Sequence, residues 1–506
     1  KELQDKTLPN FFKKVGILVV AALLGGATNY TRLATTMEYG PETQRGKSEL
    51  VSENGEESRD GLSFEYITDY SYGVSETMTF LIPNFMGGVM APGSIDKKSE
   101  FYQAVPQENQ RIVDKQISAY WGDKGAGAPT YIGAVIIFLF VLGILYVKSP
   151  YMYWILLSTV LSIMLGWGKN MSFITEFFIN YVPYYNKFRA VTMVMIIAEF
   201  GIALLAILAL NKFLNKEGDI IEKKQKLKLA FYITAGITLL FATIPSLFLD
   251  FKGPIDDVLA NNRWPVDLLQ DYREDILSND ALRSFTFILL AAGVLWIFIK
   301  GKIKKQYVVI ILGFLMLNDL WVVDKRYLNE THFVGKSKSS FVKTEADKSI
   351  IKQNKDHSRV LNLANTFNES ATSYYHNSIG GYHAAKLLRY QELMNFQLYS
   401  EVEKIKSSLN NKRGHEFSNV LNMLNAKYII YNPNQKPIIN QNALGNAWFV
   451  SEVKVVKNAN EELDALNYFN PATIAIVDKK FTENITNFTF NPSASIKLNQ
   501  TEYQPN

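Results

Sequence analysis

The chain has 506 residues, of which 48% are hydrophobic and 20% are charged, and its formal net charge is +5. It contains no cysteine, which excludes a disulfide framework, thiolate chemistry and cysteine-based metal sites. Much of the positive charge comes from lysines between apolar segments. It therefore indicates membrane topology and attraction to lipid headgroups, and it argues against nucleic-acid binding.

Seven apolar segments in the first two-thirds of the chain predict membrane-spanning helices, each of which needs about 20 apolar residues. They cover residues 15–28, 131–147, 151–167, 190–210, 229–249, 285–299 and 307–323. The first and the sixth are short, so they need flanking residues or a thinned bilayer. The alternative for these two is that they are buried helices of a soluble core.

Lysines cluster in alternate connections between these segments, namely residues 1–14, 148, 212–228 and 300–305. By the positive-inside rule these connections are cytoplasmic, and the others face outward. We therefore expect a transmembrane bundle over residues 1–328, which includes an outward loop at 29–130. An extracytoplasmic domain follows over residues 329–506.

Other local patterns complete the predicted architecture. Residues 173–188 are rich in Phe and Tyr and are broken by Pro183, which favours a helix lying on the outer membrane surface or a re-entrant hairpin. After residue 328, alternating runs predict strands at 427–431, 447–456 and 473–477 and helices at 383–398 and 419–424. The predicted fold class is thus a polytopic α-helical membrane bundle with a C-terminal mixed α/β soluble domain. Both ends are expected to continue into further sequence.

The outward loop at 29–130 holds isolated carboxylates among Tyr, Asn, Trp and Gly residues. This combination is typical of sugar sites, where aromatic rings pack on C–H surfaces and polar groups bind hydroxyls. A carboxylate there is suited to act as general base toward an acceptor hydroxyl. The candidate catalytic residues are Asp69, Glu76 and Asp123. The alternative is that the surrounding Gly and Pro residues only shape turns and that the apolar ones dip into the membrane.

Cations are unexpected on the outward face, and those found there are candidates for binding a lipid phosphate. Arg offers a planar bidentate fork to phosphate, and Lys offers a point charge. The candidates are Arg45, Lys169, Lys187 and Arg189. Their alternative role is to reach toward lipid headgroups.

Two acidic residues fall within predicted spans. Glu199 is central in the fourth span, so it should face the bundle, be protonated or be paired. Asp319 is closer to the outer end of the seventh span and is expected to meet water. His376 and His383 are separated by a glycine pair that favours a loop, so we predict no metal site there.

Six stretches, in order along the chain, carry a family resemblance. They are YSYGVSETMTFLIPNFMGG (70–88), YWGD (120–123), NKFRAVTMVMIIAEF (186–200), GGYHAAKLLRYQEL (380–393), LNMLNAKYII (421–430) and ALGNAWFV (443–450). Together they resemble the YfhO-like bacterial membrane proteins in the form found in Bacteroidetes. That family is similar to GT-C glycosyltransferases, which use polyprenyl-phosphate sugars.

The resemblance implies a multi-pass protein of the bacterial inner (cytoplasmic) membrane that transfers a sugar from a polyprenyl-phosphate donor to a cell-envelope acceptor. It implies membrane lipids and a lipid-linked sugar as partners, and no bound cofactor besides that substrate. In GT-C enzymes the key acid usually lies in the first outward loop after the first helix, a region that we expect to lie outside this sequence. The rival hypotheses are a non-catalytic scaffold whose exterior domain binds an envelope protein or glycan, and a transporter.

Overall fold

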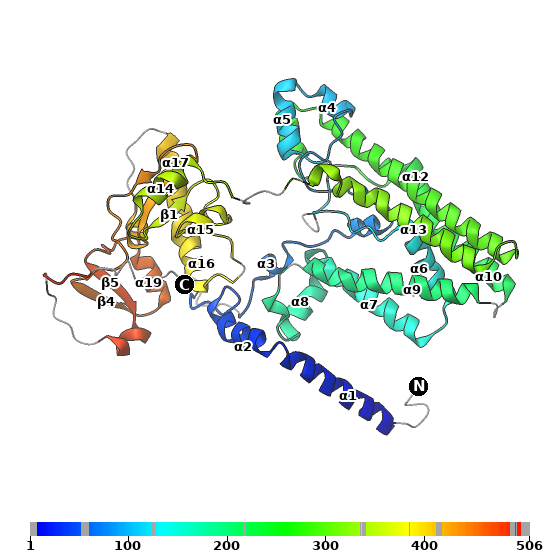
Figure 1. Cartoon of the computed structure of the whole chain (residues 1–506), viewed down its shortest axis with the longest axis horizontal. Coiled ribbons are helices and arrows are strands. Elements are labelled where there is room, and N and C mark those ends of the chain that lie inside the picture. Colours follow the sequence, from blue (N-terminus) through cyan, green and yellow to red (C-terminus); the bar gives the residue numbers. More distant parts are fainter. Residues whose placement is uncertain are drawn as a thin grey trace. The chain divides into compact units, whose positions relative to one another are not determined.

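The computed structural model describes residues 8–51, 60–123, 127–189, 191–215, 219–333, 335, 341–383, 385–410, 417–485, 491 and 493–496. The chain forms two compact units (Figure 1). One is Ser63–Gly335, and the other joins Lys1–Leu62 with Lys336–Asn506. The second boundary lies close to the predicted one at residue 328, but residues 1–62 group with the C-terminal part. The contacts within this unit include two hydrogen bonds between the Val51 backbone and the Asn460 side chain: the Val51 N–H donates to Asn460 Oδ1 over 2.9 Å, and Asn460 Nδ2 donates to the Val51 carbonyl over 2.7 Å.

All regular secondary structure among the described residues of the unit Ser63–Gly335 is helical, and we call this unit the bundle unit. Its α-helices are α3 (Phe64–Thr68), α4 (Glu100–Ala104), α5 (Gln107–Gln116), α6 (Ala134–Tyr146), α7 (Pro150–Gly166), α8 (Ser172–Tyr181), α9 (Ile196–Leu214), α10 (Ile220–Thr243), α11 (Asp256–Asn261), α12 (Val266–Ile299) and α13 (Lys305–Tyr327). Short 3₁₀ turns lie at η2 (Ser75–Phe80), η3 (Gly168–Met171), η4 (Tyr185–Lys187), η5 (Val191–Met195), η6 (Pro245–Leu247) and η7 (Glu330–His332).

Several of the described helices are long and apolar enough to cross a membrane, as expected of a helical membrane protein. Five qualify on their own: Pro9–Ala27, Val191–Leu214, Ile220–Thr243, Val266–Ile299 and Lys305–Tyr327. The pair Pro150–Gly166 and Gly168–Tyr181 counts as a sixth if its 117° bend lies within one span. Every one of the seven predicted segments coincides with a helix. The helix of the sixth segment is longer than predicted, because α12 begins nearly twenty residues earlier.

Helix α6 differs from the predicted second span because it has only 13 residues, or roughly 20 Å of helix, against a hydrocarbon core of about 30 Å. It is the central helix of the bundle unit. Phe138, Leu139 and Leu142 are fully buried, and α6 packs against α9, α10, α12 and α13. Its contact with α9 is close because a Cβ on Gly143 would lie only 2.8 Å from Leu205 Cγ.

The predicted interfacial segment at 173–188 is a helix in its first half. Helix α8 ends at Tyr181, before Pro183, which cannot continue a helix. Phe173, Phe177 and Tyr181 are strongly exposed on it, as the interfacial hypothesis requires. Whether the bent pair α7–α8 lies on the membrane surface or re-enters it stays a prediction.

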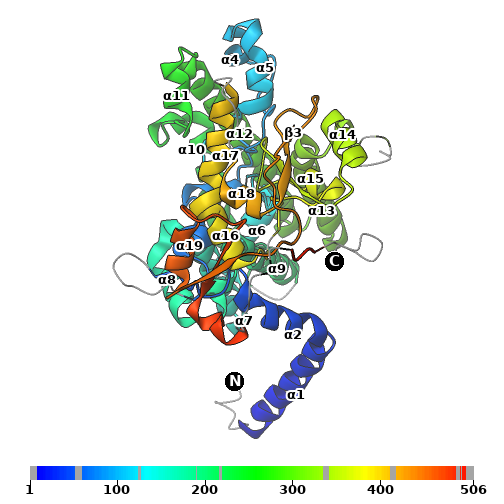
Figure 2. The same cartoon turned by 90° about the vertical axis from the view of Figure 1, so that its left-hand side faces the viewer.

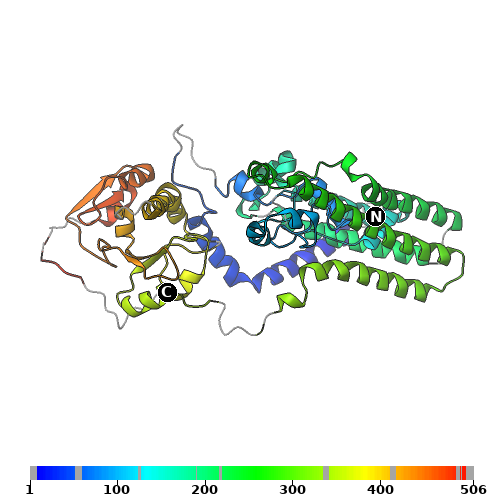
Figure 3. The same cartoon turned by 90° about the horizontal axis from the view of Figure 1, so that it is seen from above.

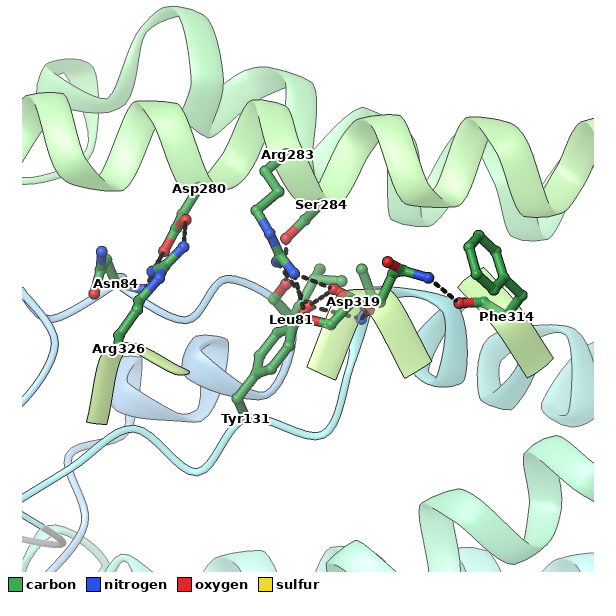
Figure 4. A network of polar contacts seen from close by, with 11 residues as sticks. Leu81, Asn84, Tyr131, Asp280, Arg283, Ser284, Phe314, Asp319 and Arg326 are labelled. Atoms are coloured by element: carbon green, nitrogen blue, oxygen red, sulfur yellow. Dashed lines mark hydrogen bonds and ion pairs between the residues drawn. The ribbon is translucent and has the colours of Figure 1, made fainter. Parts of the chain in front are cut away.

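Helix α12 carries a series of charged residues that tie its neighbours together (Figure 4). The Arg326 guanidinium of α13 donates to both Asp280 oxygens of α12 over 2.6 Å. Closer to the middle of α12, Arg283 donates to Asp319 Oδ1 over 2.8 Å. Next to this pair, Ser284 Oγ donates to the Leu81 carbonyl over 2.7 Å. These contacts join α12 and α13 to the loop that follows η2.

Asp319 does not meet water, so that prediction is wrong. Its side chain is fully buried, and besides Arg283 it accepts hydrogen bonds from the Tyr131 hydroxyl over 2.6 Å and from the Ala134 N–H over 2.8 Å. Ala134 is the first residue of α6, where a carboxylate also interacts favourably with the helix dipole. Asp319 is therefore the group that joins the start of α6 to α12 and α13.

Glu199 is exposed and does not face the bundle, which was one of the three arrangements expected for it. It lies on the exposed side of α9 between Ile196 and Phe200, whose side chains are 67% and 69% exposed. Within the described part of the chain it has no hydrogen bond or ion pair.

The unit formed by residues 1–62 and 336–506 mixes helices and short strands (Figure 2). Its helices are α1 (Leu8–Ala27), α2 (Tyr30–Tyr39), η1 (Gly40–Glu42), α14 (Glu345–Gln353), α15 (Ala371–Tyr375), α16 (Leu388–Leu393), the π-helical turn η8 (Met394–Leu398), α17 (Tyr399–Asn410), α18 (Asn419–Met423), α19 (Ala459–Ala465) and η9 (Lys479–Asn484). Its strands are β1 (Arg359–Asn362), β2 (Ala426–Ile430), β3 (Ile438–Ile439), β4 (Glu452–Val456) and β5 (Ile474–Asp478).

Strand β2 is central in a three-stranded sheet, parallel to β1 and antiparallel to β3, and β4 pairs with β5 in parallel. The predicted strands at 427–431 and 473–477 coincide with β2 and β5. The prediction at 447–456 is too long at its start, because residues 447–451 are irregular.

A further ion pair joins α12 to α11: Arg273 Nη1 lies 2.6 Å from Asp256 Oδ2, and both side chains are buried. This pair gives a test of how far the charged contacts of α12 stabilise the fold. We expect Arg273→Met to lower the free energy of unfolding by about 3–5 kcal/mol, because it leaves a buried carboxylate without its partner. Denaturant titration of the purified protein in detergent measures this change. The control is Arg111→Met in α5, where the side chain is exposed, with an expected change of about 0.5 kcal/mol or less.

The double variant Arg273→Met with Asp256→Leu removes both charges and should recover most of the lost stability. If Arg273→Met proves as stable as Arg111→Met, the pair does not hold the fold in the way described.

Candidate functional site

The bundle unit contains a cavity of about 820 Å³ that is rich in polar groups. Its walls come from the start of η2, the segment before α6, the turn η3 and the connection between η6 and α11. The lining residues are Gly73, Val74, Ser75, Glu76, Met86, Trp121, Gly122, Asp123, Asn170, Asp250, Lys252, Gly253, Pro254 and Asp257. Two of the three predicted catalytic carboxylates, Glu76 and Asp123, are among them.

Glu76 is almost fully buried, with 3% of its surface exposed. Its Oε2 accepts the Gly73 N–H over 2.6 Å, and its Oε1 contacts the Tyr120 hydroxyl. Burial raises the pKa of the Glu76 carboxyl above its ordinary value, and these two hydrogen bonds offset only part of that rise. Gly122 lies directly beside it, because a Cβ there would be 2.5 Å from Glu76 Oε1.

The Tyr120 hydroxyl contacts two acceptors, Glu76 Oε1 and the Asp123 carbonyl oxygen. A phenol has only one proton to donate. Both contacts are satisfied if Glu76 is protonated and donates to Tyr120, which then donates to the Asp123 carbonyl. The raised pKa of Glu76 is consistent with this arrangement. Glu76 therefore holds Tyr120 and, through it, the backbone at Asp123.

Asp123 is the more accessible carboxylate, with 40% of its side chain exposed. Its Oδ2 accepts a hydrogen bond from Asn170 Nδ2 over 2.9 Å, and its Oδ1 lies 3.9 Å from Lys169 Nζ. Asn170 is itself oriented by a second hydrogen bond to the Tyr72 carbonyl over 2.9 Å. The turn η3 thus brings Lys169, one of the predicted phosphate ligands, next to a predicted catalytic residue.

The connection between η6 and α11 lines another part of the cavity and contains charged residues that the sequence analysis did not single out. Lys252 Nζ lies 2.9 Å from Asp257 Oδ1, and both side chains are well exposed. Behind them, Arg273 is fully buried and donates to both carboxylate oxygens of Asp256, over 2.6 and 3.0 Å. The sequence offered one signal for these residues: several charged residues lie close together between 250 and 257, in a connection predicted to face outward.

Arg273 also fixes the backbone of this wall. Its Nε donates to the Ala119 carbonyl over 3.0 Å, and its Nη1 donates to the Phe251 carbonyl over 2.8 Å. Trp121, two residues after Ala119, packs its ring 5.4 Å from that of Phe251. The Trp121 indole N–H is buried and has no acceptor among the described residues. Such a donor is costly unless a bound molecule or a water satisfies it.

Asp69 and Arg189, predicted for different roles, are paired with each other. Arg189 Nη2 lies 2.9 Å from Asp69 Oδ2, and its guanidinium packs 4.3 Å from the Tyr66 ring centroid and 4.8 Å from that of Tyr70. Neither Asp69 nor Arg189 lines the cavity. Their contacts stabilise the junction between the segment after α3 and the start of η5.

The other predicted phosphate ligands lie elsewhere. Lys187 is half-buried at the end of η4 and does not line the cavity. Arg45 belongs to the other compact unit, where its backbone N–H donates to Thr43 Oγ1 over 3.2 Å. Within the ranges that the structure describes, no group of three His, Cys, Asp or Glu residues is placed to hold a metal ion.

Comparison of the chain with protein-family models, with curated proteins and with solved structures gives no match. The site is therefore interpreted from its own geometry. It combines a buried carboxyl, an accessible carboxylate oriented by an amide, an indole, and lysines near either wall.

Glu76 gives a test by pH. Its pKa is higher in the folded protein than in the unfolded chain, so the folded state binds the extra proton, and stability falls as pH rises above about 4.5 toward the folded pKa. Glu76→Gln mimics the protonated acid and removes this loss. We expect the difference in Tm between variant and wild type to increase in favour of the variant as pH rises through that window. A difference that stays constant with pH would show that Glu76 does not bind the extra proton.

Proposed function

We propose that this protein is a membrane glycosyltransferase, which transfers a sugar from a polyprenyl-phosphate donor to a cell-envelope acceptor on the outer face of the bacterial cytoplasmic membrane. The observation that carries the proposal is a cavity lined by Asp123, Lys252 and Trp121, in which Asp123 is partly exposed and is oriented by Asn170. The resemblance to YfhO-like proteins supports the same class of reaction and is the source of the proposed donor.

Asp123 is the proposed general base. Its carboxylate accepts the proton of the acceptor hydroxyl while the hydroxyl oxygen attacks the anomeric carbon of the sugar. The bond between that carbon and the phosphate oxygen breaks, and the phosphate leaves with the electron pair, which inverts the configuration. Of the predicted carboxylates, Asp123 fits best because Glu76 is buried and hydrogen-bonded and Asp69 is paired with Arg189.

The leaving phosphate gains negative charge, which nearby cations stabilise. Lys252 lines the cavity with 52% of its side chain exposed, and Lys169 lies beside Asp123 with 45% exposed. A lysine reaches a phosphate as a flexible point charge, so both side chains are suited to follow the phosphate during transfer. In this proposal, lysines bind the leaving phosphate. The predicted arginine, Arg189, forms an ion pair with Asp69 instead.

The remaining cavity groups are suited to a sugar. Trp121 offers an apolar ring, while Asn170 and Asp123 offer polar groups for hydroxyls. The volume of about 820 Å³ is within the usual range for small-molecule sites.

A binding role for the C-terminal residues is the second candidate function. The unit of residues 1–62 and 336–506 contains a largely apolar pocket of about 380 Å³, lined among others by Leu393, Trp448 and Leu466. The Arg389–Glu462 ion pair lies at its wall. A pocket of this kind favours a bound partner or ligand without requiring chemistry in the bundle unit.

The enzyme proposal is tested with Asp123→Asn, which keeps the shape and the polar contacts of the side chain but removes the base. We expect sugar transfer to fall by about 10²–10⁴-fold. Cells that depend on the protein are grown with the variant, and their surface glycans are quantified by mass spectrometry. Asp271→Asn, at an exposed position of α12 outside the cavity, is the matched control and should leave the glycans unchanged.

Membrane levels of both variants are measured in the same cells. If Asp123→Asn is present at the wild-type level and the glycans are also unchanged, the enzyme proposal fails and the binding role is favoured.

A further inference from the structure

Helices α10 and α12 pack against each other in the bundle unit, and a shallow groove of about 270 Å³ lies between them. The two helices are among the long green ones that run alongside each other in Figure 3. The groove is lined by apolar side chains such as Leu227, Phe231 and Leu289, and it opens outward. Its walls belong to two helices that are long and apolar enough to span a membrane, so the groove faces lipid.

Gly293 leaves open space within the groove. A Cβ added at Gly293 would meet no atom within 4 Å, so the space above it is open. Ala292 beside it is also small, while Leu289 is 48% exposed and Tyr232 is 65% exposed at the sides. A narrow apolar channel between larger side chains matches the cross-section of an acyl chain.

One end of the groove carries two cations around an aromatic ring. Lys228 Nζ lies 5.6 Å from the ring centroid of Trp296, and Lys300 Nζ lies 5.7 Å from it. Both lysines are exposed, and within the described residues neither forms an ion pair with a carboxylate. By contrast, Lys148 at a neighbouring connection is paired with Glu222 over 2.9 Å. In the part of the chain that the structure describes, no carboxylate therefore balances the charge of Lys228 and Lys300.

The place of these lysines along their helices is the one expected for residues at the level of the lipid headgroups. Helix α10 begins with a lysine-rich turn, and α12 ends at Ile299, directly before Lys300. Trp and Lys are the residues that favour the boundary between lipid headgroups and acyl chains. Anionic lipids are enriched in the cytoplasmic leaflet, the side to which the positive-inside rule assigns this lysine-rich end.

We propose that this groove is a binding site for an anionic glycerophospholipid, with one acyl chain beside Gly293 and the phosphate between Lys228 and Lys300. Two features favour a lipid as the bound molecule: the positive charge at one end of the groove complements an anionic headgroup, and an apolar channel continues from that end. The site is independent of the cavity around Asp123 and of the proposed transfer reaction.

The test uses the full chain purified in detergent, titrated with dioleoyl phosphatidylglycerol and, separately, with dioleoyl phosphatidylcholine, with bound lipid counted by native mass spectrometry. Wild type should retain phosphatidylglycerol in preference to phosphatidylcholine. The double variant Lys228→Ala with Lys300→Ala should weaken phosphatidylglycerol binding by roughly 30-fold. Its control is Lys224→Ala with Lys302→Ala, which removes the same charge from exposed lysines outside the groove and should retain wild-type binding.

A second pair of variants examines the channel. Gly293→Leu fills the open space and should abolish retention of the lipid, whereas Gly236→Leu, at an open position of α10 outside the groove, should not. The proposal is overturned if the two lipids bind equally, if glycerol phosphate without acyl chains displaces the lipid at equal concentration, or if Gly293→Leu disrupts a dimer in place of a lipid complex. Circular dichroism of each variant confirms that a loss of lipid is not a loss of fold.

Discussion

The bundle unit depends on three Arg–Asp pairs that α12 makes with its surroundings. An unpaired charge inside a low-dielectric bundle is expensive, so each guanidinium has to face a carboxylate at hydrogen-bond distance. Arg273 pairs with Asp256, the first residue of α11. Asp280 pairs with Arg326, and Arg283 pairs with Asp319. Because the partners lie on α11 and α13, these pairs fix how α12 aligns with its neighbours.

The shape of the cavity depends on one of these pairs, Arg273 with Asp256. Arg273 holds the Ala119 carbonyl, and the adjacent Tyr120 hydroxyl connects Glu76 with the backbone at Asp123. From the opposite direction, Asn170 of η3 orients the Asp123 carboxylate. The accessible carboxylate is therefore positioned by a buried guanidinium, a buried carboxyl and an amide, each from a different segment. Such preorganisation is what a site needs if charge develops during a reaction.

Many of the helices and some of the cavity residues could be predicted from the sequence, but the buried ion pairs could not. The apolar segments were recognisable because a span has a characteristic length and composition, and Glu76, Asp123 and Lys169 stood out as polar residues in outward connections. Arg273 was missed because it lies inside a helix whose start no local pattern marked. The fate of Asp319 was mispredicted because position along a helix does not reveal that Arg283 and Tyr131 cover it.

By itself the sequence determined which segments are apolar helices and which connections carry carboxylates and lysines, because those properties belong to consecutive residues. Only the tertiary structure decided that Asp69 pairs with Arg189 and that Glu76 is buried while Asp123 is partly exposed. It also decided that Glu199 lies on the exposed side of its helix. Burial and ion pairing depend on distances between segments far apart in the chain. Those distances are set by packing, which composition and spacing do not encode locally.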